Sequence, residues 1–162
     1  MFTRATTLEQ FAAIAALART IWTEHYTPII GTAQVDYMLS RFQSTAAIAE
    51  QVQQDGYFYY LVETTGSAIG YFAVQPRAET LFLSKIYVRS DRRGQGWGRT
   101  MMDCIEQLAR DNRKSQITLT VNRHNAQSIA AYQKLGFENL GSVQTDIGSG
   151  FIMDDFCFAK QL

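Results

Sequence analysis

The fold of this chain is set by the segment RGQGWG at residues 93–98. It follows a stretch at 81–88 that is rich in β-branched and aromatic residues, and it opens a helix-like stretch at 97–113. Glycines let the turn between a strand and a helix be tight and let a ligand approach the backbone. The first helical amides have no partner within the helix, and the helix dipole adds positive potential there. The segment therefore predicts an anion site, and the alternative is a solvated, arginine-rich turn before a surface helix.

Two familiar phosphate loops are excluded by residue spacing. A P-loop places Lys-Ser or Lys-Thr after its last glycine, whereas Gly98 is followed by Arg99 and Thr100. A dinucleotide fingerprint that began at Gly94 would need a third glycine at position 99. Arginines crowd the turn at positions 89, 92, 93 and 99. These features predict a phosphate-bearing ligand that is held in a different way.

A second segment, LTVNRHNAQSIAAYQKLGF at residues 119–137, completes a recognisable pair of motifs. Together the two resemble the GNAT superfamily of acyl-CoA N-acyltransferases, whose loop is R/Q-x-x-G-x-G/A after a strand that ends in valine. In that superfamily the second motif runs from Asn through a small residue and Tyr to Gly-Phe. The matching positions are Val88, Arg93, Gly96 and Gly98, then Asn125, Ser128, Tyr132, Gly136 and Phe137. The flanks at 21–39 and 146–158 are similar to the branch that includes the bacterial polyamine N-acetyltransferases.

Composition limits the class of protein. The 162 residues, 46% of them hydrophobic, predict one domain, 1–162, with a substantial core. Fifteen basic and fifteen acidic residues cancel, which disfavours nucleic acid as a partner. No run of about eighteen apolar residues predicts a membrane span, and the first residues lack the apolar core of a signal peptide, so a cytoplasmic location is expected. Cys104 and Cys157 are expected to be buried thiols, and two histidines are too few for a metal cluster.

The pattern of apolar residues predicts a single-domain α/β fold. Strands are expected near 2–5, 57–63, 68–75, 81–88, 117–121, 138–145 and 150–160, and helices near 7–28, 33–42, 45–54, 97–113 and 127–135. Thr7 and Gln10 form a capping box at the first helix, and Pro28 is expected to end it. The GNAT resemblance implies a mixed, mostly antiparallel sheet of about seven strands with helices on both faces. It also implies that strands 81–88 and 117–121 splay apart.

The resemblance implies that acetyl-CoA is the co-substrate and that no metal takes part. The amides of 94–99 would bind the pyrophosphate, and Arg93 would fix either the loop or a phosphate. The backbone at 86–88 would pair with the pantetheine arm like an added strand. Asn125 would bond to the pantetheine or pyrophosphate, cap the following helix, or do both. The predicted cofactor-binding residues are Ile86, Tyr87, Val88, Arg93, Gly94, Gln95, Gly96, Trp97, Gly98, Arg99, Asn125, Ser128 and Tyr132.

Aminolysis of a thioester needs an uncharged amine and a proton for the departing thiolate. An alkyl amine has a pKa of about 10, so it must lose a proton before it attacks. Tyr132 is the predicted general acid, and its alternative role is packing on an amphipathic helix. The predicted base is Glu79. Glu24, His25 or a water chain to a carboxylate are the other candidates, and Glu24 and His25 are also predicted to contact the acceptor.

An acidic pair, Asp154 and Asp155, interrupts an otherwise apolar strand. Alternation along the strand sends one carboxylate to each face, so at least one should be partly buried and need a partner. Either the pair binds a cationic substrate, or it forms a salt bridge with Lys85 or an arginine.

We predict an acetyl-CoA-dependent N-acetyltransferase. It would move an acetyl group to a primary amine, a small cationic one such as a polyamine, by direct attack in a ternary complex. The alternatives are a non-catalytic acyl-CoA-binding module, an acetyltransferase acting on a protein N-terminus or lysine, and a nucleotide-binding protein of another fold. A homodimer is our hypothesis for the oligomeric state.

Overall fold

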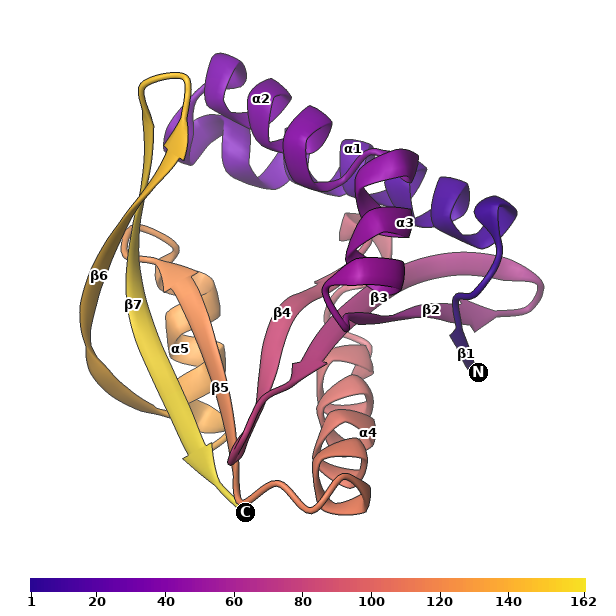
Figure 1. Cartoon of the computed structure of the whole chain (residues 1–162), viewed down its shortest axis with the longest axis vertical. Coiled ribbons are helices and arrows are strands. Elements are labelled where there is room, and N and C mark those ends of the chain that lie inside the picture. Colours follow the sequence, from indigo (N-terminus) through magenta and orange to yellow (C-terminus); the bar gives the residue numbers. More distant parts are fainter.

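The computed structural model describes residues 1–162 as helices and strands around one sheet (Figure 1). The elements in chain order are β1 (Phe2–Arg4), α1 (Leu8–Ile30), α2 (Thr32–Phe42), α3 (Thr45–Gln54), β2 (Phe58–Thr64), β3 (Ser67–Pro76), β4 (Thr80–Val88), α4 (Trp97–Asp111), β5 (Gln116–Asn122), α5 (Ala126–Lys134), β6 (Glu138–Gly148) and β7 (Phe151–Gln161). A 3₁₀ turn, Ser90–Arg92, lies between β4 and α4. This is the predicted order, and it confirms the α/β fold class.

The sheet has seven strands in the order β1-β2-β3-β4-β5-β7-β6. All neighbouring strands are antiparallel except β4 and β5, which are parallel because α4 crosses over between them. The predicted hairpin between β2 and β3 is present, and its turn places Thr65 and Gly66 at positive φ. The prediction of a mixed, mostly antiparallel sheet is therefore confirmed.

Helices cover both faces of the sheet, as predicted (Figure 1). On one face α1, α2 and α3 bury Phe11, Ile14, Ile21, Trp22, Leu39 and Ile48 against Tyr59 and Tyr71. On the other face α4 buries Met101, Met102 and Ile105 against Phe72, Leu81, Ile117 and Phe158. Burial of each large apolar side chain contributes about 1.5–3 kcal/mol. The two cores hold the sheet between them and fix where its strands lie.

The parallel strands β4 and β5 separate soon after they begin. They pair only at Thr80↔Gln116, Leu81↔Ile117 and Phe82↔Thr118. Beyond that point β4 stays with β3 and β5 stays with β7, and the two diverge as a V (Figure 1). The predicted splaying is therefore confirmed, and one edge of β4 has no strand partner over its second half.

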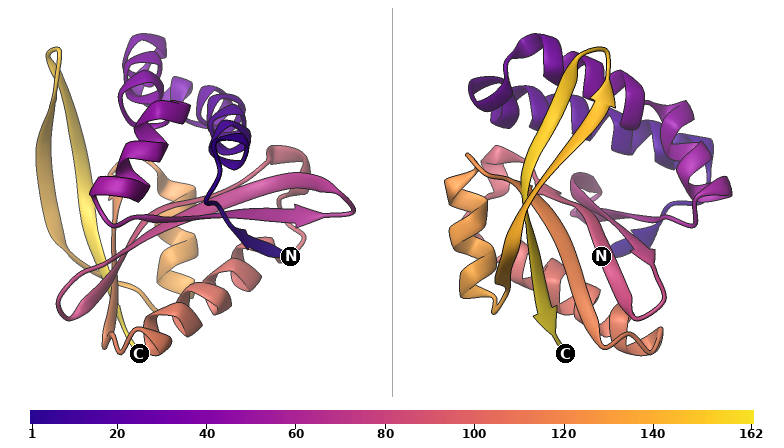
Figure 2. Two further views of the ribbon diagram at one scale, coloured as in Figure 1. Left: turned by 45° about the vertical axis from the view of Figure 1, so that its right-hand side comes forward. Right: turned by 60° about the vertical axis from the view of Figure 1, so that its left-hand side comes forward.

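The long hairpin β6–β7 closes the side of the molecule next to α2 (Figure 2). The Tyr37 hydroxyl donates to the Ile147 carbonyl at 2.6 Å, and Gln34 Nε2 donates to the Ile152 carbonyl at 3.2 Å. These contacts join the C-terminal hairpin to the N-terminal helices. They place β7 beside the opening between β4 and β5.

One helix boundary differs from the prediction. Pro28 does not end the first helix, because α1 continues to Ile30 and stops at Gly31, whose φ is 86°. Proline removes one backbone bond, but Ile30 packs against the α1-side core together with Tyr26. That packing holds the helix for one half-turn more. The capping box between Thr7 and Gln10 is present as predicted.

No helix in the structure combines the length and the apolar character needed to cross a membrane. Both cysteines are free thiols, and each is partly exposed rather than buried. Within α4 the buried stripe consists of Met101, Met102, Ile105 and Ala109. Trp97, Cys104 and Leu108 are partly buried and lie at its margin.

Candidate functional site

The glycine loop presents a row of free backbone amides. Gly94 and Gly96 have φ of 74° and 85°, in the left-handed region that favours glycine. The first bond of α4 is donated by the Thr100 amide to the Gly96 carbonyl at 3.1 Å. The six amides of residues 94–99 donate to no acceptor in the structure. Successive unpaired amides at a helix N-terminus form an anion-binding surface.

The space over this loop is open. A Cβ atom added to Gly94, Gly96 or Gly98 would meet no other atom within 4 Å. Gly98 also lacks positive φ, so neither its backbone conformation nor packing explains a glycine there. Its lack of a side chain leaves room for something outside the chain.

The arginines around the loop are partly committed to the protein. Arg93 Nε donates to the Val88 carbonyl at 3.2 Å, which ties the loop to the end of β4. Arg89 forms an ion pair with Asp91 at 2.8 Å, and Arg99 forms one with Asp103 at 3.3 Å. The backbone amides, more than these arginine side chains, are therefore the donors left free for a ligand.

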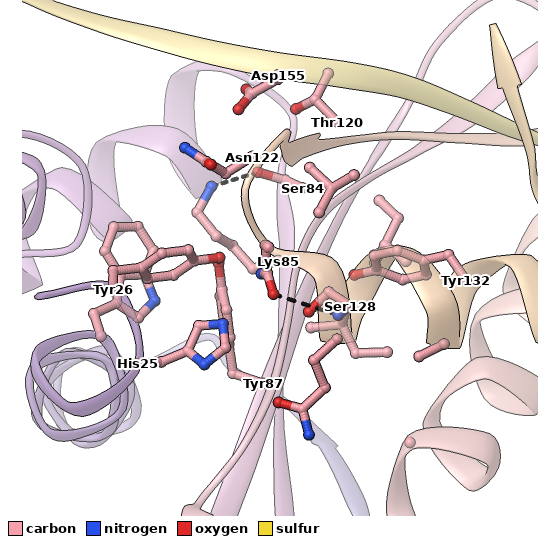
Figure 3. A pocket seen from close by; sticks show the side chains of 18 of the residues that line it. His25, Tyr26, Ser84, Lys85, Tyr87, Thr120, Asn122, Ser128, Tyr132 and Asp155 are labelled. Carbon is pink, nitrogen blue, oxygen red and sulfur yellow. Dashed lines mark hydrogen bonds between the residues drawn. The ribbon is translucent and has the colours of Figure 1, made fainter. Parts of the chain in front are cut away.

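A cavity of about 530 Å³ opens between the separated halves of β4 and β5 and is bounded by α1 and α5. Its lining residues include Trp22, His25, Tyr26, Lys85, Ile86, Tyr87, Val88, Arg93, Gly98, Asn125, Ser128, Tyr132 and Asp155. Figure 3 shows Tyr26, Lys85 and Tyr132 projecting into the space from α1, β4 and α5. The cavity runs from the glycine loop, through Arg93 and Gly98, to the inner face of β7.

A β-bulge in β4 decides which side chains enter this cavity. Ala73 pairs with Lys85 and Val74 with Leu83, so Ser84 is an extra residue in β4. Before the bulge, Leu83 packs in the core on the α4 side. After it, alternation is shifted by one residue, so Lys85 turns toward the α1 side. Regular alternation would have directed this lysine into the α4-side core.

Asp155 is the one carboxylate that lines the cavity, and it is 5% exposed. Its oxygens form no hydrogen bond or ion pair within the protein. Burial raises the pKa of Asp155 to about 6, the charge of Asp154 adds to the rise, and Lys85 opposes it. Lys85 Nζ donates to Ser84 Oγ at 2.7 Å (Figure 3), and burial lowers its pKa to about 8 against the pull of Asp155. The cavity thus holds two opposite charges that are not in contact.

Asp154 lies on the other face of β7. It pairs with Arg123 at 2.8 Å, and each side chain is about one-third exposed. The prediction that alternation separates the acidic pair is therefore confirmed by the positions of both residues. Asp154 has an arginine partner, and Asp155 is left as the cavity carboxylate.

Three tyrosines place hydroxyl groups in the cavity. The hydroxyls of Tyr26 and Tyr87 are hydrogen-bonded at 3.0 Å. Burial raises the pKa of Tyr132, and the neighbouring Tyr26 adds to the rise. A raised pKa keeps the Tyr132 phenol protonated at neutral pH, which is the state required of a proton donor. The ring also contacts Phe137 edge-on, so Tyr132 is held in place by packing while it faces the cavity.

Asn125 links the start of α5 to the cavity. Its Oδ1 accepts a hydrogen bond from the Ser128 amide at 3.3 Å, so the predicted helix cap is present. Asn125 is 3% exposed and lines the cavity together with Ser128 and His25. Burial lowers the pKa of His25, the nearby Arg93 charge lowers it further, and Asn125 opposes the shift. His25 is therefore biased toward its neutral form.

Two predicted acceptor-side carboxylates lie outside the cavity. Glu79 is exposed and precedes β4, at the end where β4 and β5 are still paired. Glu24 is exposed on α1 and accepts a hydrogen bond from Ser90 Oγ at 2.9 Å, which ties α1 to the 3₁₀ turn. Neither lines the cavity. Gln95, Trp97 and Arg99 also lie outside its lining and reach the site only through their backbone amides.

The places of Tyr26, the Tyr87 side chain and Lys85 in the cavity were not predicted from the sequence. A signal was available, because Ser84, Lys85 and Tyr87 are polar residues within a strand that is otherwise apolar. Their direction depends on the bulge, which residue spacing does not reveal.

Comparison with known proteins identifies the family. The sequence pattern of the acetyltransferase (GNAT) family matches residues 14–137. The chain therefore belongs to that family, the class of N-acetyltransferases that its fold and glycine loop predict. The chain is 25% identical over 137 residues to human N-acetyltransferase 8, covering 81% of this chain and 56% of that protein. It spans about half the length of the curated relatives that it matches.

Solved structures share the whole fold. PaiA N-acetyltransferase from Thermoplasma acidophilum, in complex with coenzyme A, aligns with a TM-score of 0.81 at 17% identity, covering 100% of this chain and 99% of that one. A GNAT acetyltransferase from Elizabethkingia anophelis with acetyl-CoA bound aligns with a TM-score of 0.61 at 18% identity, covering 74% and 84%. These likenesses confirm the predicted fold.

Proposed function

We propose that this chain transfers an acetyl group from acetyl-CoA to a primary amine by direct attack in a ternary complex. The observation that carries the proposal is the continuity between the six free amides of residues 94–99 and the cavity between β4 and β5. A diphosphate needs hydrogen-bond donors, and an extended acyl arm needs an open strand edge that leads inward. Here the free amides of 94–99 supply the donors, and the adjoining edge of β4 supplies the open strand edge. Coenzyme A and acetyl-CoA are the ligands of two proteins with the same fold.

The pyrophosphate lies on the amides of 94–99 in this proposal. The pantetheine arm follows the unpartnered edge of β4 at 86–88, which no longer pairs with β5. Asn125 and Ser128 border the same passage from the α5 side. The thioester then lies near the bulge, in the space that Lys85, Tyr87 and Tyr132 line (Figure 3).

Tyr132 serves as the general acid. Its phenol, which is protonated at neutral pH, gives a proton to the thiolate as the carbon–sulfur bond breaks. The largely apolar lining of the cavity strengthens electrostatic interactions inside it.

The acceptor in this proposal is a small cationic amine such as a polyamine. Asp155 supports that choice, because a buried carboxylate without a partner in the protein favours a cationic ligand. The similarity of the flanks at 21–39 and 146–158 to the polyamine N-acetyltransferases points the same way. Asp154 does not take part, since it is paired with Arg123 on the other face.

The test is release of free coenzyme A from acetyl-CoA across a panel of amines. Turnover with an alkyl amine or a polyamine supports the proposal, and a higher kcat/KM for spermidine than for a monoamine of similar length supports a cationic acceptor. Binding of acetyl-CoA without release of thiol with any amine would favour the non-catalytic module. Turnover with peptides alone would favour a protein N-terminus or lysine.

We further propose a single domain in the cytoplasm that forms a homodimer. The packing of all helices on one sheet supports one domain. Two free cysteines suit a reducing compartment.

A further inference from the structure

The transfer reaction needs a base in the cavity, and neither of the predicted carboxylates lies there. Asp155 does. Glu79 and Glu24 lie outside the cavity, whereas Asp155 is its one carboxylate. It is 5% exposed, faces inward from β7 and has no donor within the protein. A carboxylate in that state is unfavourable unless a ligand supplies a proton donor or a cation.

We propose that Asp155 is the base that takes the proton from the acceptor amine before it attacks the thioester. The inference rests on the proposed function and assigns a residue to its least determined step. An alkyl ammonium ion has a pKa of about 10 and carries no lone pair for attack. A buried carboxylate beside the thioester both attracts the ammonium ion and receives its proton.

The step balances as follows in atoms and charge. An ammonium N–H bond breaks, and the proton forms an O–H bond on Asp155, leaving a neutral amine. The nitrogen lone pair attacks the thioester carbonyl, and the carbon–nitrogen bond forms. As the carbonyl is restored the carbon–sulfur bond breaks, and the thiolate takes the Tyr132 proton. The nitrogen loses its second proton to the Tyr132 phenolate, and Asp155 later releases its proton to water.

The surroundings of Asp155 match this role. Lys85 from β4 and Tyr26 from α1 face the same space, and Asp154 lies behind it on β7. Neighbouring β5 and β6 present Asn122 and Val143 opposite it, neither of which titrates. The remaining titratable side chains of the cavity are His25, Tyr57, Tyr87, Arg93 and Tyr132. Burial and Asp154 raise the pKa of Asp155, while Lys85 limits the rise, so the carboxylate is charged at neutral pH and is still a better proton acceptor than an ordinary one.

His25 and Lys85 are the other cavity groups able to accept a proton, and Lys85 is mostly protonated at neutral pH because its pKa is about 8. His25 lies near Arg93, whose charge lowers its pKa, and near Asn125, whose side chain opposes that shift. It forms an edge contact with Tyr26. Asp155 is favoured because it is the more deeply buried group and has no partner in the protein, whereas His25 is only half-buried.

The experiment compares acceptors that differ in basicity. Coenzyme A release is measured at neutral pH with a simple alkylamine and with trifluoroethylamine, whose ammonium form is acidic enough that the amine is already neutral. For Asp155→Asn we expect kcat/KM to fall at least about a hundredfold with the alkylamine and much less with the neutral amine. Asp154→Asn is the matched control, one residue away on the opposite face. It keeps the Asp155 carboxylate and removes only a charge that raises the pKa of Asp155, so it should change both values by less than about threefold.

A second variant tests the same assignment through pH. Lys85→Met removes the positive charge that lowers the pKa of Asp155, so the acid limb of the kcat/KM profile should move to higher pH. Acetyl-CoA binding by calorimetry verifies that each variant is folded.

Equal losses with both amines in Asp155→Asn would show that the residue only shapes the cavity and would overturn the inference. An unchanged rate, with the amine-selective loss appearing in His25→Gln instead, would transfer the role to His25. If the wild-type chain releases no coenzyme A with any amine, the proposed function fails, and the inference fails with it.

Discussion

The two ends of the cavity are built in different ways. The donor end consists of backbone, namely six unpaired amides at residues 94–99 and the open edge of β4. The acceptor end consists of side chains that arrive from separate elements, with Tyr26 on α1, Lys85 on β4 and Asp155 on β7. The donor end lies within one continuous segment of the chain. The acceptor end exists only after residues far apart in sequence have come together.

Because of this difference, substitutions at the donor end and at the acceptor end should have different consequences. A backbone site depends on glycines at fixed spacing and on a helix that begins at a fixed place, so its ligand is set by the local sequence. A side-chain site can change its chemistry by single substitutions that leave the fold intact. We therefore expect substitutions at the two ends to affect separate properties, namely binding of the donor at one and the transfer step at the other.

The largest expected effect belongs to the transfer step. Tyr132→Phe should lower kcat about a hundredfold, because the hydroxyl acts only as the thiolate departs. The affinity for acetyl-CoA, measured by calorimetry, should change little. A fall of less than about threefold, with chemistry rate-limiting, would make Tyr132 a packing residue and weaken the division between the two ends.

Donor binding should respond next, at Gly98. Gly98→Val adds a side chain over the free amides, at a position with ordinary φ and open space, so the fold should tolerate it. We expect acetyl-CoA to bind at least about tenfold more weakly, a loss of about 1.4 kcal/mol. Gly96→Val should weaken binding too, but there positive φ adds backbone strain. Gln107→Val, further along α4, is the control and should bind normally; unchanged affinity in a folded Gly98 variant would refute a backbone-built donor end.

The unpaired charge of Asp155 at the acceptor end should lower the thermal stability of the protein in a pH-dependent way. Burial raises the pKa of Asp155 from 3.8 to about 6, so the folded state binds its proton more tightly than the unfolded state. The stability from that protonation is present below the unfolded pKa and is lost as pH rises through the folded pKa. Asp155→Asn should therefore raise Tm by a few degrees near about pH 7.5 and leave it unchanged near about pH 4.

Asp154→Asn is again the matched control for this measurement. It loses a partly exposed ion pair with Arg123, a contribution of about 0–1 kcal/mol, so its Tm should fall slightly or stay the same. A lower Tm for Asp155→Asn at the higher pH would mean that the carboxylate is stabilised within the protein, contrary to its lack of a partner.

The smallest effect should be at Glu79. Glu79→Gln alters an exposed residue outside the cavity, so kcat/KM and its pH profile should match those of the wild type. Loss of the acid limb of the pH profile in this variant would identify Glu79 as the base and would contradict the role of Asp155.

The order of elements was predictable from the periodicity of apolar residues. The mostly antiparallel sheet and the splayed strands were predictable from the family resemblance that two local motifs carry. The glycine loop was predictable because it is one of those motifs. The position of Lys85 was not, since it depends on an extra residue at Ser84 that shifts alternation within β4. Which of Asp154 and Asp155 faces the cavity also stayed open, because alternation separates the two without saying which face is inward.

The most direct measurement is an amide NMR titration with coenzyme A, which reports each backbone amide separately. We expect the largest shifts at residues 94–99, followed by the edge of β4 at 86–88, with smaller changes around Asp155. The same titration of Gly98→Val should lose the shifts of the loop. Large shifts elsewhere, with the amides of 94–99 unmoved in the wild type, would contradict a donor site built from backbone.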